Sequence, residues 1–422
     1  MSTARVVASG VLIGVAFVLL RRWSPADGSP LFFSILGLAC VGYAMAMRAL
    51  FRHRHPSRTV LLLALLLALG WRLPLAMAPV GEGADVYRYL WDARVQRAGQ
   101  NPYAALPSDP ALEWIHSPYT RRMNNPDVPS PYPPVAQWFF RAVTSLHESP
   151  EAMKLALVAC EVLLVVVLWQ WLALTGRDPS WVLAYAWHPL ATLEIARNGH
   201  CDVLGVLLVC LSALALGRRW QTTAATALAL AVGAKLLPVV LIPLYWKRVR
   251  RRDVAMATLV LAAATAPFVW GGVPRAGSIP NVVERFRFNA PVFTWAQSLV
   301  GAWGAAGLAL AAGLATSVVC RRFDVTTTPA AWAWPLAIAL ACSPLVYPWY
   351  LLWVVPMLTT ASGLPLLAWS LTILPTYGVW HWSGSGAPWR VPFGILVVEF
   401  GIPLVLAAYL VWTAPGRQKP LS

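Results

Sequence analysis

The sequence predicts an all-α, polytopic integral membrane protein, and composition and hydropathy both carry that prediction. Hydrophobic residues make up 58% of the 422 residues and charged residues only 12%, which is too little polar surface for a water-soluble domain. Apolar runs close to the roughly 20 residues that cross a bilayer recur along the whole chain. Because hydrocarbon offers no partners for backbone polar groups, these runs must be helices. We therefore expect a single membrane domain, residues 1–422, of about 11 to 14 transmembrane helices.

The spanning segments can be placed in order along the chain. The first apolar run, residues 6–20, is followed by Arg21, Arg22 and Trp23, where a signal peptide would carry small residues at a cleavage site, so we expect a retained helix. Residues 222–246 are expected to form two short helices that meet near Lys235. Long spans are expected at residues 31–50, 59–80, 152–175, 253–271 and 391–413.

The basic residues predict the orientation of the chain. The formal net charge is +16, but the arginines and lysines gather in short clusters between spans, which is the positive-inside pattern. We therefore expect no nucleic-acid partner, and we place the clusters in the cytoplasm. The long polar loop of residues 80–133, which we expect to carry short interfacial helices, then lies outside, together with residues 198–202. The clusters are Arg48–Arg58, Arg177, Arg218–Arg219, Lys247–Arg252, Arg321–Arg322 and Arg417–Lys419.

The sequence contains no motif for a cofactor. The six cysteines lie in or beside apolar runs and none lies in the loop of residues 80–133, so packing roles are expected rather than disulfides or a metal framework. No HExxH, Walker loop or strand-linked GxGxxG is present. Asp85, His200 and Asp202 could together bind a metal, but neither paired cysteines nor a dense carboxylate loop accompanies them. We expect no required metal and no other cofactor.

The external loop opens with GADVYRYLWDARVQRAGQNPY, residues 83–103. At 100° per residue, a helix here places Val86, Leu90 and Ala93 on one face and a polar stripe on the other. The stripe can face a cavity at the membrane surface. An inert interfacial helix, in which Arg88 pairs with a neighbouring acid, is the alternative. The polar stripe consists of Asp85, Arg88, Tyr89, Asp92 and Gln96.

The end of the loop is rich in proline, in the segment NNPDVPSPYPPVAQWFF of residues 124–140. Proline removes backbone donors and stiffens turns, so we expect an ordered loop that folds back on the spans. Tyr132 is then held beside the start of the helix that carries Gln137.

Ionisable and polar side chains also interrupt the apolar helices. A charge at membrane depth costs about 2.5 to 3.5 kcal/mol on insertion scales, so such residues are candidates for function. A snorkelling position or a buried hydrogen bond is the alternative for each of them. They are His188, Glu194, His200, Asp202, Lys235, Tyr347, Tyr350 and Glu399.

Five segments in order resemble the GT-C superfamily of membrane glycosyltransferases, specifically the family-87-type enzymes that use polyprenyl-phosphate-mannose. They are GADVYRYLWDARVQRAGQNPY, SPYPPVAQWFF, HPLATLEIARNGHCD, KLLPVVLIPLYWKR and YPWYLLWVVP, between about residues 80 and 360. The resemblance implies an inverting transfer in which an acceptor hydroxyl attacks the anomeric carbon and the lipid phosphate leaves. It also implies that the first large external loop carries an acid that acts as general base or positions the acceptor, and Asp85 stands at that place; we expect Asp85 to be the base.

The resemblance suggests roles for further residues. Asp92 is the second choice for the base or a support for Arg88, and aromatic faces can pack on sugar. Cations must stabilise the leaving phosphate. Candidates for the phosphate are Lys235, Arg285 or Arg287, and Arg390; candidates for the sugar or lipid phosphate are Tyr132, Tyr347 and Trp349; His200 and Asp202 could bind sugar hydroxyls; and Arg88, Tyr89, Tyr103, Gln137 and Tyr350 complete the expected substrate-binding set.

One departure and two alternatives accompany this interpretation. About three spans precede the loop, where many GT-C enzymes have one, so residues 1–58 can be read as an addition. The partners expected are a polyprenyl-phosphate-linked sugar, a glycan or lipid acceptor and membrane lipids, at an external or periplasmic site of a multi-pass cell-membrane protein. The same chemistry with another sugar such as arabinose is one alternative. The other is a lipid or solute transporter gated by Asp85 and Lys235.

Overall fold

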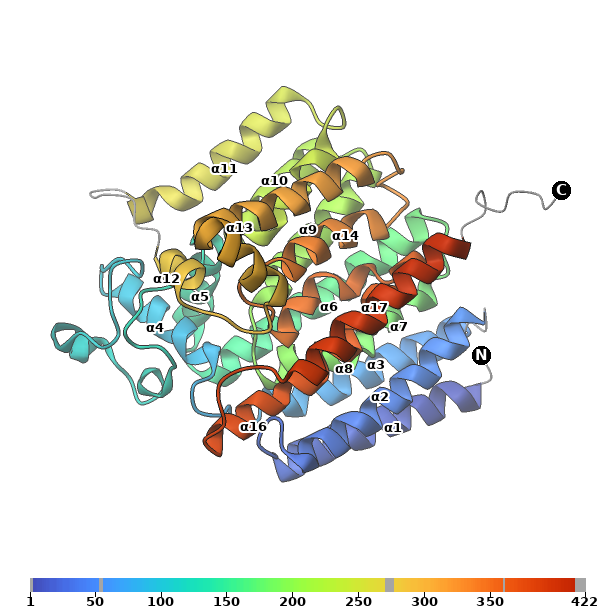
Figure 1. The fold of residues 1–422 in the computed structure, drawn as a ribbon, viewed down its shortest axis with the longest axis horizontal. Coiled ribbons are helices and arrows are strands. Elements are labelled where there is room, and N and C mark those ends of the chain that lie inside the picture. The colour runs from blue at the N-terminus through green and yellow to red at the C-terminus, as the bar shows by residue number, and fades with distance from the viewer. Residues whose placement is uncertain (1–2, 53–55, 270–276, 360, 414–422) are drawn as a thin grey trace.

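The computed structural model describes residues 3–52, 56–269, 277–359 and 361–413, and every regular element in these ranges is a helix. One isolated parallel bridge joins Phe288 to Leu345. The helices form a bundle with a separate group of short helices and turns at one end (Figure 1). The prediction of an all-α polytopic protein is confirmed.

Seven helices in the described residues are long and apolar enough to cross a membrane. Several begin at a serine whose hydroxyl accepts a hydrogen bond from a backbone N–H three residues on: Ser29 from Phe32, Ser57 from Val60, and Ser149 from Ala152. These caps satisfy donors that an open helix start would expose. The seven are α1 (Thr3–Trp23), α2 (Pro30–Phe51), α3 (Arg58–Ala76), α6 (Pro150–Leu174), α11 (Arg251–Val269), α13 (Pro291–Cys320) and α17 (Phe393–Thr413).

Shorter segments run between these long helices. Lys235, just after α10 (Gln221–Ala234), meets Asp202 at the start of α9 (Asp202–Gly217), while Ser212 contacts Ala224 near the turn between them. The two helices are therefore antiparallel. A 3₁₀ helix, η5 (Leu237–Tyr245), follows α10 and returns until the hydroxyl of Tyr245 contacts that of Ser212. The predicted pair of short helices meeting near Lys235 is confirmed.

The remaining elements are short and many are irregular. Prolines within or beside them interrupt regular α-helix, so the chain passes through the bundle in 3₁₀ and π turns as well. They are α4 (Asp85–Arg97), η1 (Pro110–Ile115), η2 (Thr120–Arg122), α5 (Pro134–Leu146), η3 (Pro179–Val182), α7 (Leu183–Ala186), α8 (Pro189–Ala191), the π-helix η4 (Thr192–Arg197), α12 (Ile279–Glu284), α14 (Ala330–Ala341), η6 (Pro348–Trp353), η7 (Val355–Met357), η8 (Ala361–Gly363), α15 (Leu364–Thr372), η9 (Leu374–Tyr377) and α16 (Gly378–Gly384).

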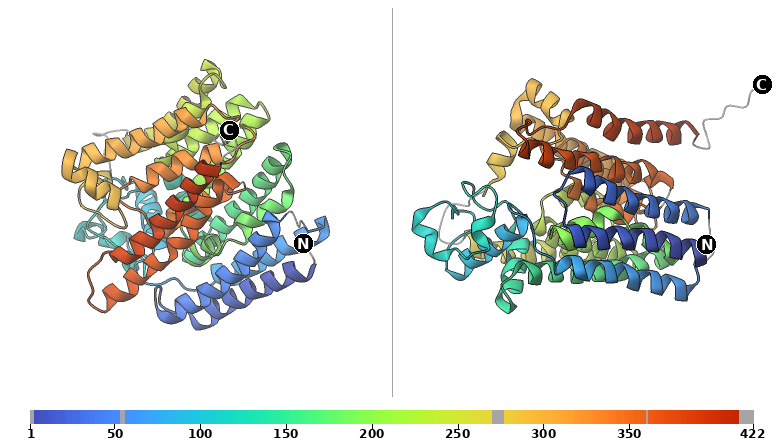
Figure 2. Two further views of the ribbon diagram at one scale, coloured as in Figure 1. Left: turned by 45° about the vertical axis from the view of Figure 1, so that its right-hand side comes forward. Right: turned by 90° about the horizontal axis from the view of Figure 1, so that it is seen from below.

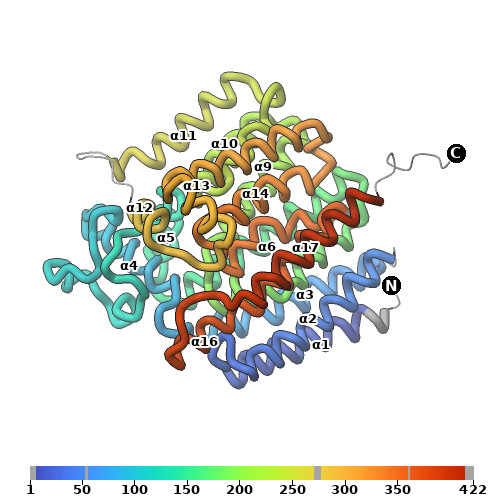
Figure 3. Tube along the Cα trace, in the orientation of Figure 1, coloured from blue at the N-terminus to red at the C-terminus, as the bar shows by residue number. Residues whose placement is uncertain are grey.

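The bundle has two distinct ends. The loop of residues 80–133 projects at one end, the loop end, whereas the start of α1 and the end of α17 lie at the other (Figures 1 and 2). The chain can be followed between the two ends in Figure 3. Basic clusters gather opposite the loop, where Arg177 donates to the carbonyl of Thr359 at 2.8 Å and Arg248 to that of Arg321 at 3.0 Å. Arg417–Lys419 and residues 53–55 of the Arg48–Arg58 cluster lie outside the described residues.

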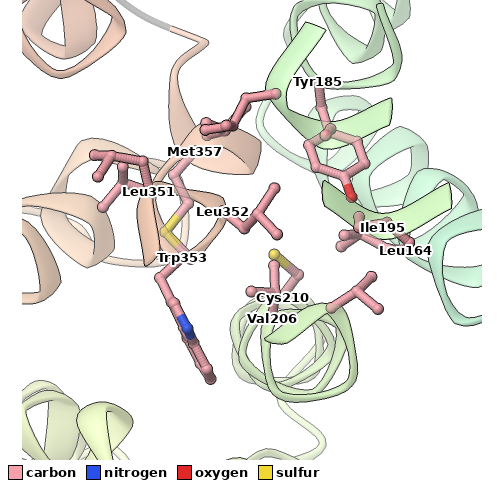
Figure 4. Packing of buried hydrophobic residues seen from close by; sticks show 14 of the residues in the cluster. Leu164, Tyr185, Ile195, Val206, Cys210, Leu351, Leu352, Trp353 and Met357 are labelled. Atoms are coloured by element: carbon pink, nitrogen blue, oxygen red, sulfur yellow. The ribbon is translucent and has the colours of Figure 1, made fainter. Parts of the chain in front are cut away.

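One continuous set of buried apolar side chains, from Val6 to Tyr377, fills the bundle. Figure 4 shows Leu352 of η6 pointing toward Cys210 of α9, with Tyr185 and Ile195 beside them. Trp353 next to it is fully buried as well. The irregular η6 segment is therefore packed as firmly as a regular helix. This packing fixes the aromatic residues at the start of η6, and the one just before it, at the loop end.

Two buried carboxylates tie helices together inside the bundle. Glu161 of α6 accepts from Nε and Nη2 of Arg72 on α3 at 2.6 and 2.8 Å. Glu399 is the single buried residue of α17, a helix described from end to end, and one of its oxygens accepts from Asn289 and Trp369, both at 2.9 Å. An unpaired charge in this setting is costly, so each acid must keep its partners. Glu161 thereby holds α6 against α3, and Glu399 holds α17 against α15 and the segment before α13.

Replacing Glu161 with glutamine leaves Arg72 as a buried cation without its counter-ion, and we expect a loss of about 3 to 5 kcal/mol of stability. The measurement is the thermal unfolding temperature of the purified protein in detergent. The apolar double replacement Arg72→Met with Glu161→Leu is expected to regain most of the loss. A Glu161→Gln protein as stable as the wild type would contradict a dry, charge-dependent contact.

Candidate active site

The loop of residues 80–133 is folded together with α4, and we call this part the loop domain. Helix α4 lies at its base and is surrounded by other elements. Ten of its 13 residues are buried, because α5 and α6 pack on one side and η1 and η2 of the loop cover the other. An interfacial helix would keep one face open, so the inert interfacial alternative does not fit this burial. The polar stripe of α4 instead faces the Pro-rich segment and the end of the bundle.

Arg88 holds the Pro-rich segment against α4. Its guanidinium donates to the carbonyls of Val128 at 3.0 Å and Asn125 at 2.6 Å. The hydroxyl of Tyr103 donates to the carbonyl of Tyr132 at 2.8 Å. The loop is ordered and folded back, as the prolines predict, and the polar atoms of Arg88 and Tyr103 are occupied by that task.

Asp92 lies at the centre of a buried hydrogen-bond network. Its Oδ2 accepts from the hydroxyl of Ser130 and from the side-chain amide of Gln137, the latter at 2.9 Å. Gln96 donates in turn to Gln137 at 2.8 Å. Burial raises the pKa of Asp92 to about 6, although the charge of Arg88 and the hydrogen bonds from Ser130 and Gln137 oppose the rise. The carboxyl of Asp92 therefore stabilises the interior of the loop domain through these hydrogen bonds.

Asp85, the first residue of α4, is more open than Asp92. Its side chain is 24% exposed, and it accepts hydrogen bonds from the hydroxyl of Tyr132 at 3.1 Å and from Asn124 at 3.4 Å. Burial opposes its ionisation, but the neighbouring His200 and the two hydrogen bonds outweigh burial and hold the pKa of Asp85 below its usual value. Asp85 is an ionised carboxylate at neutral pH.

His200 lies between two carboxylates. Its Nδ1 is 3.6 Å from Oδ2 of Asp85, and its Nε2 is 3.0 Å from Oε2 of Glu194 in the π-helix η4. Burial disfavours a charged ring, yet the two acids together raise the pKa of His200 to about 10. The adjacent backbone N–H of Cys201 donates to the hydroxyl of Tyr89 at 3.2 Å, which ties this turn to α4.

A ladder of aromatic rings covers His200. The ring of Trp349 stacks on the imidazole with centroids 4.0 Å apart, and Tyr347 stacks on Trp349 at 4.4 Å. Phe288 continues the ladder at 4.6 Å from Tyr347. These contacts bring residues of η6 and of the segment before α13 to the same place as the start of α4.

A second charged pair lies at the same end of the bundle. The ammonium group of Lys235 is 2.6 Å from Oδ1 of Asp202 and 4.1 Å from the ring centre of Tyr350. The indole of Trp353 donates to the same oxygen of Asp202 at 2.6 Å. Asp202 is buried while Lys235 is 25% exposed, so the cation, not the acid, faces open space.

The structure gathers most of the predicted site residues but leaves two apart. Arg285, just after α12, and Arg390, after α16, are exposed, and no hydrogen bond or ion pair of their side chains occurs within the described ranges. Arg287 is occupied by Gln297, at 2.9 Å from its Nε. The sequence drew attention to Glu194 as an acid in an apolar run, but it gave no sign that Glu194 contacts His200, because that contact depends on the π-helix.

Asp85, His200 and Asp202 do not come together as a metal site. Among the residues that the structure describes, no group of three or more His, Cys, Asp or Glu side chains could hold a metal ion. Asp202 is directed at Lys235 and Trp353 instead of at His200. The arrangement places a partly exposed base, a partly exposed cation and stacked aromatic rings at one end of the bundle, and such groups can carry out acid–base and group-transfer chemistry on a polar substrate.

Comparison with known proteins places the chain beside a described family. Residues 5–249 match a family model described as alpha-(1->6)-mannopyranosyltransferase, N-terminal domain. The matched range covers more than half of the chain and includes most of α1, all of α2, the loop of residues 80–133 and the turn that carries His200. No curated protein and no solved structure matches the chain.

Asparagine at position 92 keeps an acceptor for Ser130 and Gln137 but removes the buried charge. Folding raises the pKa of Asp92 to about 6. Below about pH 6 the folded protein therefore keeps a proton on Asp92 that the unfolded chain has already released. As pH rises toward 6, the folded protein loses this advantage and the stability of the wild type falls. We expect Asp92→Asn to unfold at a higher temperature than the wild type at about pH 7.5, with a smaller difference at about pH 5.

Scanning fluorimetry across pH measures this difference in unfolding temperature. Asp127→Asn, at an exposed position of the same loop, is the matched control and is expected to show no such pH-dependent gain. An Asp92→Asn protein whose stability deficit relative to the wild type grows as pH rises would contradict the prediction and show that the charge itself holds the loop domain together.

Proposed function

The chain belongs to the alpha-(1->6)-mannopyranosyltransferase family and is a mannose-transferring glycosyltransferase of the membrane, and from this premise we propose its donor, its stereochemistry and its base. The donor is mannose linked to a polyprenyl phosphate, and the acceptor is a glycan or lipid. Transfer inverts the anomeric centre, and Asp85 is the general base. The single observation that carries this proposal is that two partly exposed, oppositely charged groups, Asp85 and Lys235, each held by its own buried partner, lie at the same end of the bundle.

Asp85 has the environment of a base that acts on a hydroxyl group. Its low pKa keeps it ionised at neutral pH, and its open position allows an acceptor to approach. As the acceptor oxygen bonds to the anomeric carbon, its proton passes to Asp85, and the bond from that carbon to the phosphate oxygen breaks with both electrons going to the phosphate. Positioned general bases of this kind contribute about 10² to 10⁴ in rate.

Lys235 is the best placed of the proposed cations for the leaving phosphate. Its charge is held by the buried carboxylate of Asp202, and its own side chain is 25% exposed. A fixed cation at this point stabilises the negative charge that grows on the phosphate. Arg285 and Arg390 are exposed at the loop end and would serve a phosphate only by moving toward it, so they rank below Lys235.

The sugar would lie against the aromatic rings near Asp85. The candidate rings are Tyr132, Tyr347 and Trp349, and sugars pack on aromatic side chains. Tyr347 and Trp349 are each stacked on two other rings of the ladder, so a sugar would meet their edges and the ring of Tyr132. The nitrogens of His200 are directed at Asp85 and Glu194, which leaves it less suited to a sugar hydroxyl than the sequence suggests. We assign Arg88, Tyr89, Tyr103, Gln137 and Asp92 to the support of this surface, because their polar atoms contact the protein itself.

The family description supports a narrower substrate. An inverting transfer that yields an α-linked product must start from a β-linked donor, and an α-(1→6) linkage requires the primary hydroxyl of the acceptor sugar as the nucleophile. We propose that residues 1–422 act as one unit, with residues 80–133 as the catalytic loop. The lipid tail keeps the donor in the membrane, and the proposed active site lies on the external or periplasmic face of the cell membrane.

The donor and the base are tested together with purified protein in detergent. We expect transfer of radiolabelled mannose from a β-linked polyprenyl-phosphate donor to a membrane-extract acceptor, and a loss of about 10² to 10⁴-fold for Asp85→Asn because the base is removed. Asp127→Asn is the control. Full activity of Asp85→Asn would remove Asp85 as base, and transfer from an arabinose donor alone would overturn the choice of sugar.

The side of the membrane is tested by cysteine accessibility. Ser108→Cys in the loop and Thr327→Cys at the opposite end are both exposed positions and differ only in their expected side. In intact cells, an impermeant maleimide is expected to label Cys introduced at 108 and to leave Cys introduced at 327 unlabelled until the cells are broken. The reverse pattern would place the proposed site in the cytoplasm. The wild-type protein reports any labelling of its own cysteines.

A further inference from the structure

Glu194 is a buried acid that the transfer chemistry described above does not use. Its side chain is fully buried, and it lies in the π-helix η4. Its Oε2 faces Nε2 of His200 at 3.0 Å and accepts from Asn198 at 3.1 Å, while its Oε1 has no hydrogen-bond partner. π-Helical turns are rare and frequently occur at functional sites. Burying an acid costs free energy, so Glu194 needs a role that explains its position.

The geometry around His200 fixes its protonation. A neutral imidazole has one N–H donor and one acceptor nitrogen, whereas an ionised carboxylate only accepts. His200 has a carboxylate facing each ring nitrogen, so a neutral ring would always turn a lone pair toward a negative oxygen. A doubly protonated imidazolium donates to Glu194 through Nε2 and turns its second N–H, which has no hydrogen-bond partner, toward Asp85 at 3.6 Å. Burial of Glu194 beside a cation is far cheaper than its burial alone.

Other charged groups near this turn have partners of their own. Lys154 of α6, which packs on Gly199, donates to the carbonyls of Leu75, at 3.1 Å, and Ala78. Arg197 pairs with Asp27, and Lys235 with Asp202. From η6, the group that covers the ring is the neutral Trp349. Asp85 and Glu194 are thus the ionisable groups that face His200.

We propose that Glu194 is a positioning residue of the transfer reaction, which holds His200 as an imidazolium directed at Asp85 and so keeps the base ionised and oriented. This inference rests on the proposed function, because Asp85 is the group it serves. Glu194 touches neither donor nor acceptor in this proposal and acts through His200. Its negative charge favours the protonated form of the ring, and through that ring it acts on Asp85.

The proposal predicts a change in the shape of the pH profile. In the wild type both carboxylates retain the His200 proton, so kcat/KM is expected to be level from neutral to mildly alkaline pH. Glu194→Gln keeps the size of the side chain but removes one charge, and the pKa of His200 must then fall. A new descending limb is expected in this range, with about a tenfold loss per pH unit beyond the new pKa.

Three variants make the result specific. Glu194→Asp keeps the charge and is expected to lower kcat without the new limb. His200→Gln removes the titrating ring, so His200→Gln and the double variant with Glu194→Gln are expected to have parallel, level profiles. A Glu194→Gln profile that is lower than but parallel to that of the wild type, at an unchanged unfolding temperature, would overturn the proposal and leave Glu194 with a purely structural role.

A second readout does not depend on activity. In protein labelled with ¹⁵N-histidine, the His200 signals, assigned by their loss in His200→Gln, are expected to remain those of an imidazolium through mildly alkaline pH in the wild type and to titrate at lower pH in Glu194→Gln. A neutral ring in the wild type at pH 7 would overturn the inference. Failure of transfer with an imidazolium still present would instead count against the proposed function alone.

Discussion

Burial of charge inside a helical bundle is the constraint on which the rest of this structure depends. An ionised side chain away from water must meet an opposite charge or lose its own. Arg72 with Glu161, and Lys235 with Asp202, satisfy that requirement with single ion pairs. His200 satisfies it with two acids, Asp85 and Glu194. The difference between these sites lies in exposure, because only Asp85 and Lys235 leave part of a charged side chain free to meet another molecule.

Irregular helices make this arrangement possible. A regular α-helix repeats every 3.6 residues and satisfies its backbone groups with its own hydrogen bonds. The direction of each side chain is therefore set by the helical repeat, and an acid points in another direction only where that repeat changes. The π-helix η4 supplies that change for Glu194, and the 3₁₀ segment η6 does so for Trp349 and Trp353. The buried side chains around Leu352 pack against η6 and η4 and hold both segments in place. The site is thus built where the bundle departs from ideal helices.

The loop domain completes the site by a different means. Prolines fix the path of residues 124–134, and Arg88 binds the carbonyls that this path exposes. Tyr132 then reaches Asp85 with its hydroxyl. Asp92 stays inside the domain with Ser130 and Gln137, where a raised pKa marks it as a group that is expensive to ionise. Two acids seven residues apart on one helix face therefore have opposite environments, the outer one ionised and open, the inner one enclosed.

The sequence by itself determined the helical class, the long spans, the break near Lys235 and the ordered loop, and it drew attention to Asp85, His200 and Lys235, which the fold brings to one end of the bundle. It could do so because hydropathy, proline content and the cost of intramembrane charge are properties of local segments. It could not separate Asp85 from Asp92, assign Arg88 to loop carbonyls, or connect Glu194 to His200. Those choices rest on contacts between residues as far apart as 85 and 200, and only tertiary packing decides which acid is open, which is enclosed and which charge each one meets.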